Sequence, residues 1–324
     1  MVQMFKQHTA WLTGVPFALL YGAVARIIFG QNLPTDAFVV MSWAFLFLVP
    51  VAIGALTVWF TPSQRRTSWT NAFFLPWLSC GIGAAIAGLF FIEAFICVVM
   101  ALPILFVMSS IGGLLMCLVL RRRGSQNQMM LLGVLLLTPY VAAPIESHFA
   151  TREATATVET QVFITADSAT VWANIIRVPM IHDEERSYSP VFDLFGAPKP
   201  LAATLDHAGI GGVRRGLFEK NLAFIETITV WEPERRIAWS IHADTSQVTE
   251  APWPEIGGRY FEVAAASYRI EPVDGGVVLH LSSTHRLTTR FNGYGLLWTR
   301  WGLGEFQRQI LQVIKGRAEK GGSI

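Results

Sequence analysis

The first feature of this sequence is a shortage of charge. Only 15% of its 324 residues are Asp, Glu, Lys or Arg, whereas a soluble domain usually has about 25%. The formal net charge of +2 is too small to indicate a phosphate-binding surface, so we expect no nucleic-acid partner. Cysteine is also scarce: Cys80, Cys97 and Cys117 stand at no zinc or redox spacing. We expect them to be small apolar packing residues.

The shortage of charge is confined to the first half of the chain. Before residue 151 there are seven Lys or Arg and three Asp or Glu, while the remainder has 18 and 20. The second half therefore has the charge density of an ordinary folded domain. This contrast predicts two domains in two solvents, a membrane domain at 1–150 and a soluble domain at 154–320.

The first half contains long apolar runs. About 20 mostly apolar residues are needed for a helix to cross the hydrocarbon core of a bilayer. We divide one very long run near Glu93, and we note that the last run is short and contains Pro139 and Pro144. The expected spans are about 11–29, 38–60, 72–92, 97–120 and 129–145. Two alternatives stay open: a cleavable signal ending at Ala23-Val24-Ala25, and a re-entrant fifth segment, which would leave the soluble domain in the cytoplasm.

The orientation follows from the cations of the short loops. Lys6, the pair Arg65-Arg66 and the run 121–123 all fall on one side of the five spans, and the opposite turns carry Asp36 and Glu93 without a cation. Lys and Arg in short loops are retained on the cytoplasmic side. We therefore expect a multi-pass protein of the cytoplasmic (inner) membrane, with a cytoplasmic N-terminus and an extracytoplasmic C-terminal domain.

Arg26 is the only cation inside an expected span. A charge in this position is either functional, because it is costly to bury unpaired, or a structural residue that pairs with Glu93 or reaches the membrane surface. Nothing else in the spans indicates a carrier, since there is no chain of acids or histidines.

The pattern changes to alternation in the soluble half. We expect a strand at 157–165, a short helix capped by Asp167 or Ser168 and ended by Pro179, and a long amphipathic helix at about 293–320. Between the helices, short turns connect antiparallel strands. These strands are expected at 201–207, 213–219, 223–231, 236–243, 260–270 and 277–287. The fold class is thus an α-helical transmembrane bundle followed by an α+β domain with a bent antiparallel sheet around a long C-terminal helix.

Several segments of the second half resemble a known family. They are Ile164-Thr165-Ala166 leading to Val171-Trp172 and Ile175, then 226–233 with Ile237-Ala238-Trp239, and finally 268–272 leading to Gly275-Gly276. Together they resemble the polyketide cyclase/dehydrase and lipid-transfer group of the START-like (SRPBCC) superfamily over roughly residues 154–320. The resemblance implies a helix-grip domain whose cavity receives an apolar or amphipathic small molecule. Members of the family bind lipids, cyclise or dehydrate polyketides, or act as assembly factors, so the fold alone does not decide the function.

Alternation along a strand also assigns polar residues to the inner face. In the strand 223–231, an inward Val230 implies an inward Glu226. In the strand 260–270, an inward Tyr268 implies that Tyr260 and Glu262 face inward as well. The residues expected to bind a ligand are Phe224, Glu226, Ile228, Trp239, Tyr260, Glu262, Tyr268 and His285.

These polar residues allow two interpretations. A carboxylate desolvated among aromatic rings has a raised pKa and can act with His285 as an acid–base pair on an enolisable substrate. Alternatively, Glu226 or Glu262 forms an ion pair with Arg215 or Arg269 at the rim of the cavity. No metal or other cofactor is expected, because His280 and His285 are five residues apart and so lie on opposite faces of one strand.

Four aromatic residues have two plausible uses. Tyr294, Trp298 and Trp301 open the last helix, and Trp253 lies in the preceding loop. They either pack the core and a lid, or lie at the bilayer interface beside the mouth of a cavity.

Three functions are compatible with these sequence features. The first is a membrane-tethered domain that binds or transfers a lipid, a quinone or a polyketide-like compound, with membrane lipids as its surroundings. The second is a cyclase or dehydratase that uses Glu and His in the cavity. The third is a non-catalytic assembly or sensory protein, which would have a filled core and an exposed apolar patch.

Overall fold

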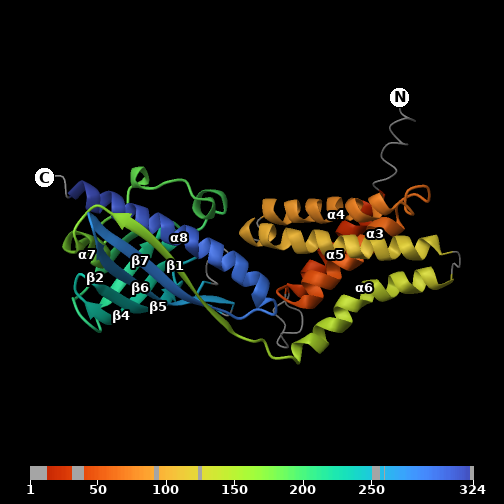
Figure 1. Cartoon of the computed structure of the whole chain (residues 1–324). Helices are drawn as coiled ribbons and strands as arrows, with labels where there is room; N and C mark the ends of the chain where they lie inside the picture. Colours follow the sequence, from red (N-terminus) through yellow and green to blue (C-terminus); the bar gives the residue numbers. More distant parts are fainter. Residues whose placement is uncertain are drawn as a thin grey trace. The chain divides into compact units, whose positions relative to one another are not determined.

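The structure is a computed structural model that describes residues 13–30, 40–90, 95–122, 126–249, 256–258 and 260–321 (Figure 1). The chain divides into two compact units, Met1–Thr151 and Arg152–Ile324. The predictions made at Lys6, Asp36, Glu93, Arg123 and Trp253 lie outside the described residues.

The first unit is helical. Its helices are α2 (Gly14–Phe29), η2 (Ala44–Leu48) continuing into α3 (Val49–Trp59), α4 (Trp69–Leu89), α5 (Phe95–Arg121) and α6 (Gln126–Ser147). The last three are long and apolar enough to cross a membrane, and Gly14–Phe29 and Ala44–Trp59 are shorter apolar helices. This composition indicates membrane association. Although Pro139 and Pro144 lie inside α6, the helix continues through both.

Two contacts show which helix ends share a side of the first unit. Arg121 Nε, at the end of α5, donates to the carbonyl of Thr67, two residues before α4, at 2.8 Å. At the end of α6, the Glu146 carboxylate accepts from the backbone N–H groups of Trp43 and Ala44 at 2.8 and 2.9 Å. A carboxylate is favourable there because the first N–H groups of a helix have no partner within the helix. The end of α6 therefore lies beside the start of η2 and α3.

Small residues allow the helices of this unit to approach closely. A Cβ atom at Gly54 of α3 would overlap the carbonyl of Ser109 of α5, and one at Gly112 of α5 would overlap the carbonyl of Val51. Such contacts are typical of helix pairs in membranes, where packing rather than the hydrophobic effect holds helices together. Arg26 lies in the last turn of α2.

The second unit is a seven-stranded antiparallel sheet with two main helices. Its strand order is β1-β7-β6-β5-β4-β3-β2. The curved sheet and the long terminal helix fit the helix-grip fold implied by the resemblance (Figure 1). The elements are β1 (Ala154–Ile164), α7 (Ser168–Ile176), β2 (Pro200–Leu205), β3 (Val213–Phe218), β4 (Ala223–Glu232), β5 (Arg236–Asp244), β6 (Phe261–Val273), β7 (Gly276–Leu287) and α8 (Asn292–Gly321).

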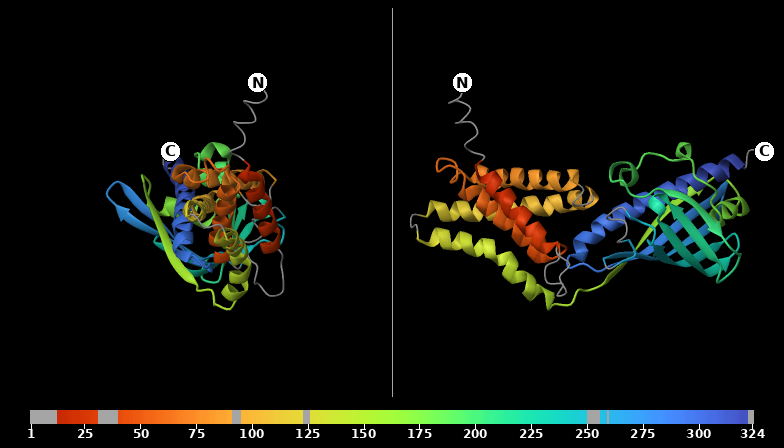
Figure 2. Two further views of the ribbon diagram at one scale, coloured as in Figure 1. Left: turned by 90° about the vertical axis from the view of Figure 1, so that its right-hand side faces the viewer. Right: turned by 180° about the vertical axis from the view of Figure 1, so that it is seen from behind.

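Helix α8 lies along the inner face of the sheet (Figure 2). The side chain of Gln307 is fully buried there. Its amide nitrogen donates to the Val158 carbonyl and to Ser283 Oγ, both at 3.0 Å, and its oxygen accepts from Thr160 Oγ1 at 2.7 Å. These bonds pair the buried amide with β1 and β7 and fix the rotation of α8.

The α7 end of the inner face is a packed core. Asp167 caps α7, as its carboxylate accepts from Thr170 N at 2.7 Å. The helix then buries Val171, Trp172 and Ile175 against the sheet. Strand residues in this cluster are almost fully buried, and they include Ile164, Ile237, Ile270, Val277 and Leu279.

The register of the sheet shifts at three places, between Pro200 and Ala202 of β2 and at bulges in β4 and β6. In β4 the register shifts between Ile228 and Val230, so that Trp231 pairs with the buried Ile237. Trp231 therefore faces inward, and its ring lies 5.1 Å from that of Trp172 on α7. The prediction that Val230 faces inward is wrong, because the extra residue at the bulge reverses the order of faces after it. The second bulge lies in β6, between Val263 and Ala265.

Candidate ligand-binding site

A buried ion pair lies on the inner face of the sheet. Arg214 of β3 and Glu226 of β4 are directly opposite each other, and a guanidinium nitrogen donates to the carboxylate. The two residues are only 6% and 8% exposed. The Arg214 guanidinium also lies 5.0 Å above the ring of Trp239 on β5, so it is both paired and stacked. Glu226 thus has an arginine partner, but it is Arg214 rather than the predicted Arg215.

The surroundings of the ion pair are unfavourable for charge. Burial raises the pKa of the Glu226 carboxyl, and the neighbouring Arg214 guanidinium acts against that rise. Burial also raises the pKa of the adjacent Tyr268 hydroxyl, which therefore stays protonated. Removing two charges from water costs several kcal/mol per ion before their attraction is counted. This ion pair is thus a costly feature on an apolar face, toward the β2 edge of the sheet.

Two N–H donors of this cluster have no hydrogen-bond partner within the described part of the chain. They are Arg214 Nε and Trp239 Nε1, both fully covered from solvent. Buried donors without a partner are uncommon and cost about 1–3 kcal/mol each. The cluster therefore contains two buried N–H donors that no acceptor in the described residues satisfies.

An aromatic cluster, Phe192, Phe218, Phe224 and Phe306, adjoins the ion pair. The ring of Phe218 lies 5.0 Å from Phe224 and 5.8 Å from Phe306, and Phe306 lies 6.0 Å from Phe192. Gly216 lies between this cluster and the ion pair. A Cβ atom there would lie 3.4 Å from both Glu226 Oε1 and Phe218 Cε2. Because Gly216 has no side chain, no side chain of β3 separates the Glu226 carboxylate from the ring of Phe218.

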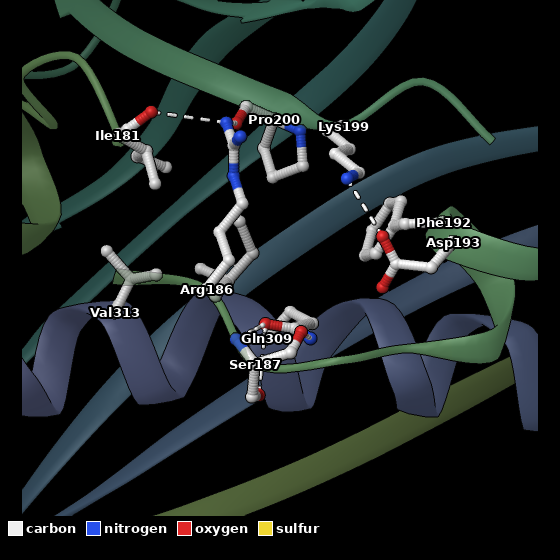
Figure 3. Close-up of a pocket in the computed structure, with 10 residues that line it drawn as sticks. Ile181, Arg186, Ser187, Phe192, Asp193, Lys199, Pro200, Gln309 and Val313 are labelled. Atoms are coloured by element: carbon white, nitrogen blue, oxygen red, sulfur yellow. Dashed lines mark hydrogen bonds and ion pairs between the residues drawn. The ribbon is translucent and has the colours of Figure 1, made fainter. Parts of the chain in front are cut away.

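A small pocket opens at the other side of the aromatic cluster, between α8 and the segment that joins α7 to β2 (Figure 3). Arg186 Nη2 donates to the Pro200 carbonyl at 2.7 Å, and Lys199 Nζ lies 2.8 Å from the Asp193 carboxylate. Phe192 belongs to both the pocket and the aromatic cluster. The pocket is lined by Ile181, Arg186, Ser187, Phe192, Asp193, Lys199, Pro200, Gln309, Ile310 and Val313. Ring contacts therefore run from Phe192 in the pocket through Phe306 and Phe218 to Phe224, which lies opposite Gly216, two residues from Arg214 on β3.

The inner face is less tightly packed on this side than at α7. Phe224 and Phe306 are only partly buried, whereas the strand residues beside α7 are almost fully buried. Large apolar side chains that stay partly exposed on the inner face of a sheet offer surface to an apolar ligand.

Glu262 does not face the site. Because of the bulge in β6, Val263 pairs with His285 and Glu262 with Arg286. The Glu262 carboxylate accepts from Arg286 Nη2 at 2.8 Å and from Nε at 3.2 Å, on the face opposite His285. The predictions of an inward Glu262 and of Arg269 as its partner are wrong. Tyr260, two residues earlier, precedes β6, and its backbone carbonyl accepts from Thr288 N at 3.0 Å.

His285 is buried on the inner face but away from both carboxylates. Its Nε2 lies 2.9 Å from Thr299 Oγ1 of α8, and burial lowers the pKa of the imidazole. Strand order separates His285 from Glu226 by three strand spacings, about 14 Å along the sheet. In the described residues neither Glu226 nor Glu262 bonds to His285. The convergence required by the acid–base interpretation is therefore absent from these residues.

The aromatic residues at the start of α8 form a row of edge-to-face contacts along the helix. The ring of Trp298 lies 6.3 Å from Tyr294 and 6.1 Å from Trp301, and Trp301 lies 5.7 Å from Phe195. Trp301 thus packs against the segment that also supplies Phe192. A position at the bilayer interface stays a prediction for Tyr294 and Trp298.

The similarities found to known proteins are distant. No family model and no curated protein matches the chain. Among solved structures, an uncharacterized protein from Rhizobium leguminosarum is 18% identical, with a TM-score of 0.31 over 52% of this chain and 99% of that one. Ara h 8.0201 is 16% identical (TM-score 0.30; 52% and 99% covered), and DynU16, from the dynemicin biosynthetic locus, is 12% identical (0.29; 50% and 49%). At these values the fold rests on the strand order and the terminal helix.

Proposed function

We propose that this protein is anchored in a membrane and binds a hydrophobic small molecule on the inner face of its C-terminal sheet. The apolar body of the ligand lies along the aromatic cluster, and its polar end reaches the Arg214–Glu226 pair. The observation that carries the proposal is a buried ion pair with unused N–H donors, next to a row of aromatic contacts that begins at the pocket. Apolar walls with a few fixed polar groups are typical of ligand sites.

An enzymatic function has less support. Acid–base catalysis needs a base within about 3 Å of the proton it removes. Glu226 is held by Arg214, and His285 lies beside Thr299. Binding without chemical change is therefore the function favoured by the geometry.

We propose five crossings and an extracytoplasmic C-terminal domain. In support, Arg65 and Arg121 belong to the side where α5 ends, and the end of α6 lies beside the start of η2, at the opposite end of α3. A continuous α6 also fits a full crossing better than a re-entrant turn. An alkaline phosphatase fused after Ile324 is expected to be active, and a green fluorescent protein fused there to be dark. The reverse result would place the domain in the cytoplasm.

The binding function is tested by identifying what co-purifies with the full chain in nanodiscs, using native mass spectrometry. The variant Gly216→Leu fills the space between Glu226 and Phe218, and we expect it to lose the bound molecule. The matched control is Thr227→Leu, which adds a similar side chain on the exposed face of β4. If wild type, variant and control all carry the same molecule in the same amount, the site lies elsewhere. If none carries any, the proposal fails.

A further inference from the structure

We infer that the polar end of the ligand is an uncharged carbonyl oxygen, as in a ketone or a quinone, that accepts hydrogen bonds from Arg214 Nε and Trp239 Nε1. This inference rests on the proposed function and specifies the ligand class of the same site. It starts from the two buried donors that have no partner among the described residues. Both groups belong to one cluster, because the Arg214 guanidinium is stacked 5.0 Å above the Trp239 ring.

The chemistry of the donors excludes several ligand groups. An ammonium group has only donors, so it would leave both N–H groups unpaired. A hydrocarbon would leave them unpaired as well, at the cost of buried donors without partners.

The charge balance of the site favours a neutral carbonyl over an anionic carboxylate as the ligand group. Glu226 already neutralises Arg214, so an anionic ligand would meet the Glu226 carboxylate without a free positive charge to compensate. Two carboxylates in one buried site repel each other strongly. A neutral carbonyl oxygen accepts two hydrogen bonds through its two lone pairs and introduces no charge.

Four probes with the same ring test this inference: 1-acetonaphthone, 1-ethylnaphthalene, 1-(1-naphthyl)ethylamine and 1-naphthoate. Each is titrated calorimetrically into the full chain in phosphatidylcholine nanodiscs, and the signal of empty nanodiscs is subtracted to remove partitioning into lipid. We expect the ketone to bind about tenfold more tightly than the hydrocarbon, as for the gain of one to two hydrogen bonds. The amine and the carboxylate are expected to bind more weakly than the ketone.

Variants assign the preference to the two donors. Trp239→Phe removes the indole N–H and is expected to abolish most of the preference for the ketone over the hydrocarbon. The control Trp172→Phe makes the same change in the same core and is expected to keep the preference. Arg214→Lys preserves the charge beside Glu226 but lacks the Nε donor, and it provides an independent test if Trp239→Phe fails to fold.

The outcomes separate this inference from the proposed function. Equal binding of ketone and hydrocarbon to the wild type would overturn the carbonyl assignment and leave hydrophobic binding intact. Tighter binding of the amine or the carboxylate than of the ketone would also overturn the carbonyl assignment. The same holds if the preference for the ketone over the hydrocarbon survives in both Trp239→Phe and Arg214→Lys. If none of the four probes binds the wild type, the proposed function fails as well.

Discussion

The ion pair between Arg214 and Glu226 leads to a quantitative prediction about stability. The substitution Glu226→Leu leaves the Arg214 guanidinium buried without its partner. Breaking a buried pair on one side costs about 3–5 kcal/mol, and both partners are less than a tenth exposed. For a unit of this size, that loss lowers the melting temperature by roughly 6–20 °C.

The double variant Arg214→Met with Glu226→Leu is expected to behave differently. It removes both charges and replaces them with apolar side chains that can fill the same space. Replacement of a whole buried ion pair is often neutral, or stabilising by about 1–4 kcal/mol. We therefore expect the double variant to melt at or above the temperature of the wild type, while it loses the ligand.

The assay is differential scanning calorimetry of the full chain in nanodiscs. Peptide-level hydrogen exchange on β3 and β4 identifies which transition belongs to the C-terminal unit, since a chain of two units need not unfold in one step. The prediction is refuted if Glu226→Leu alone leaves the transition unchanged, because the carboxylate would then not compensate Arg214. It is also refuted if the double variant is less stable than either single variant.

Three further predictions concern other contacts of the second unit. Glu262→Ala is expected to leave the melting temperature and ligand binding nearly unchanged, because this carboxylate pairs with Arg286 on the outer face of the sheet. Loss of ligand binding in this variant would show that Glu262 faces the inner side of the sheet. Gln307→Leu leaves Thr160, the Val158 carbonyl and Ser283 without their hydrogen-bond partner, and we expect calorimetry to show a loss of about 3 kcal/mol in the free energy of unfolding. An unchanged transition would mean that α8 is held by apolar packing alone. The bonds from Arg317 lower the pKa of Glu185 to about 2. The ion pair of Glu185 with Arg317 therefore stabilises the folded state fully above the ordinary carboxyl pKa, and this stabilisation is lost as the pH falls toward 2. The protection of 179–186 against hydrogen exchange, relative to the intrinsic rate at each pH, should decrease over that range in the wild type and depend less on pH in Glu185→Gln.

Much of the second unit could be predicted from its sequence because each element has a local signal. Turn residues separate the strands, Asp167 marks the start of α7, and an apolar stripe marks α8. The observed strands differ from the expected ones by only a few residues at their ends. These signals depend on backbone preferences and periodicity, which the sequence displays directly.

The candidate site was harder to predict, because bulges and pairing depend on tertiary structure. The sequence around Ala264 has no glycine to mark the extra residue of β6, so simple alternation placed Glu262 on the wrong face. Arg214 was missed for a related reason. Its position opposite Glu226 depends on the register between β3 and β4, which single-strand alternation does not supply. One signal in the sequence could have found it. Arg214 stands four residues before the apolar Phe218 in the same strand, so strict alternation places both side chains on the same face.

The ion pair also bears on the distinction between a binding domain and an assembly domain. A domain that served only as a packed scaffold would gain stability from apolar residues at 214 and 226, since the charges cost more to desolvate than a well-packed core requires. The structure instead places them where the tight core beside α7 gives way to partly exposed rings, with Gly216 leaving room beside the carboxylate. A ligand that contacts both the rings and the unused donors would offset part of that cost by satisfying those donors. The double variant therefore separates the two functions: a scaffold would be unaffected in its role, whereas a binding domain would stay folded and lose its ligand.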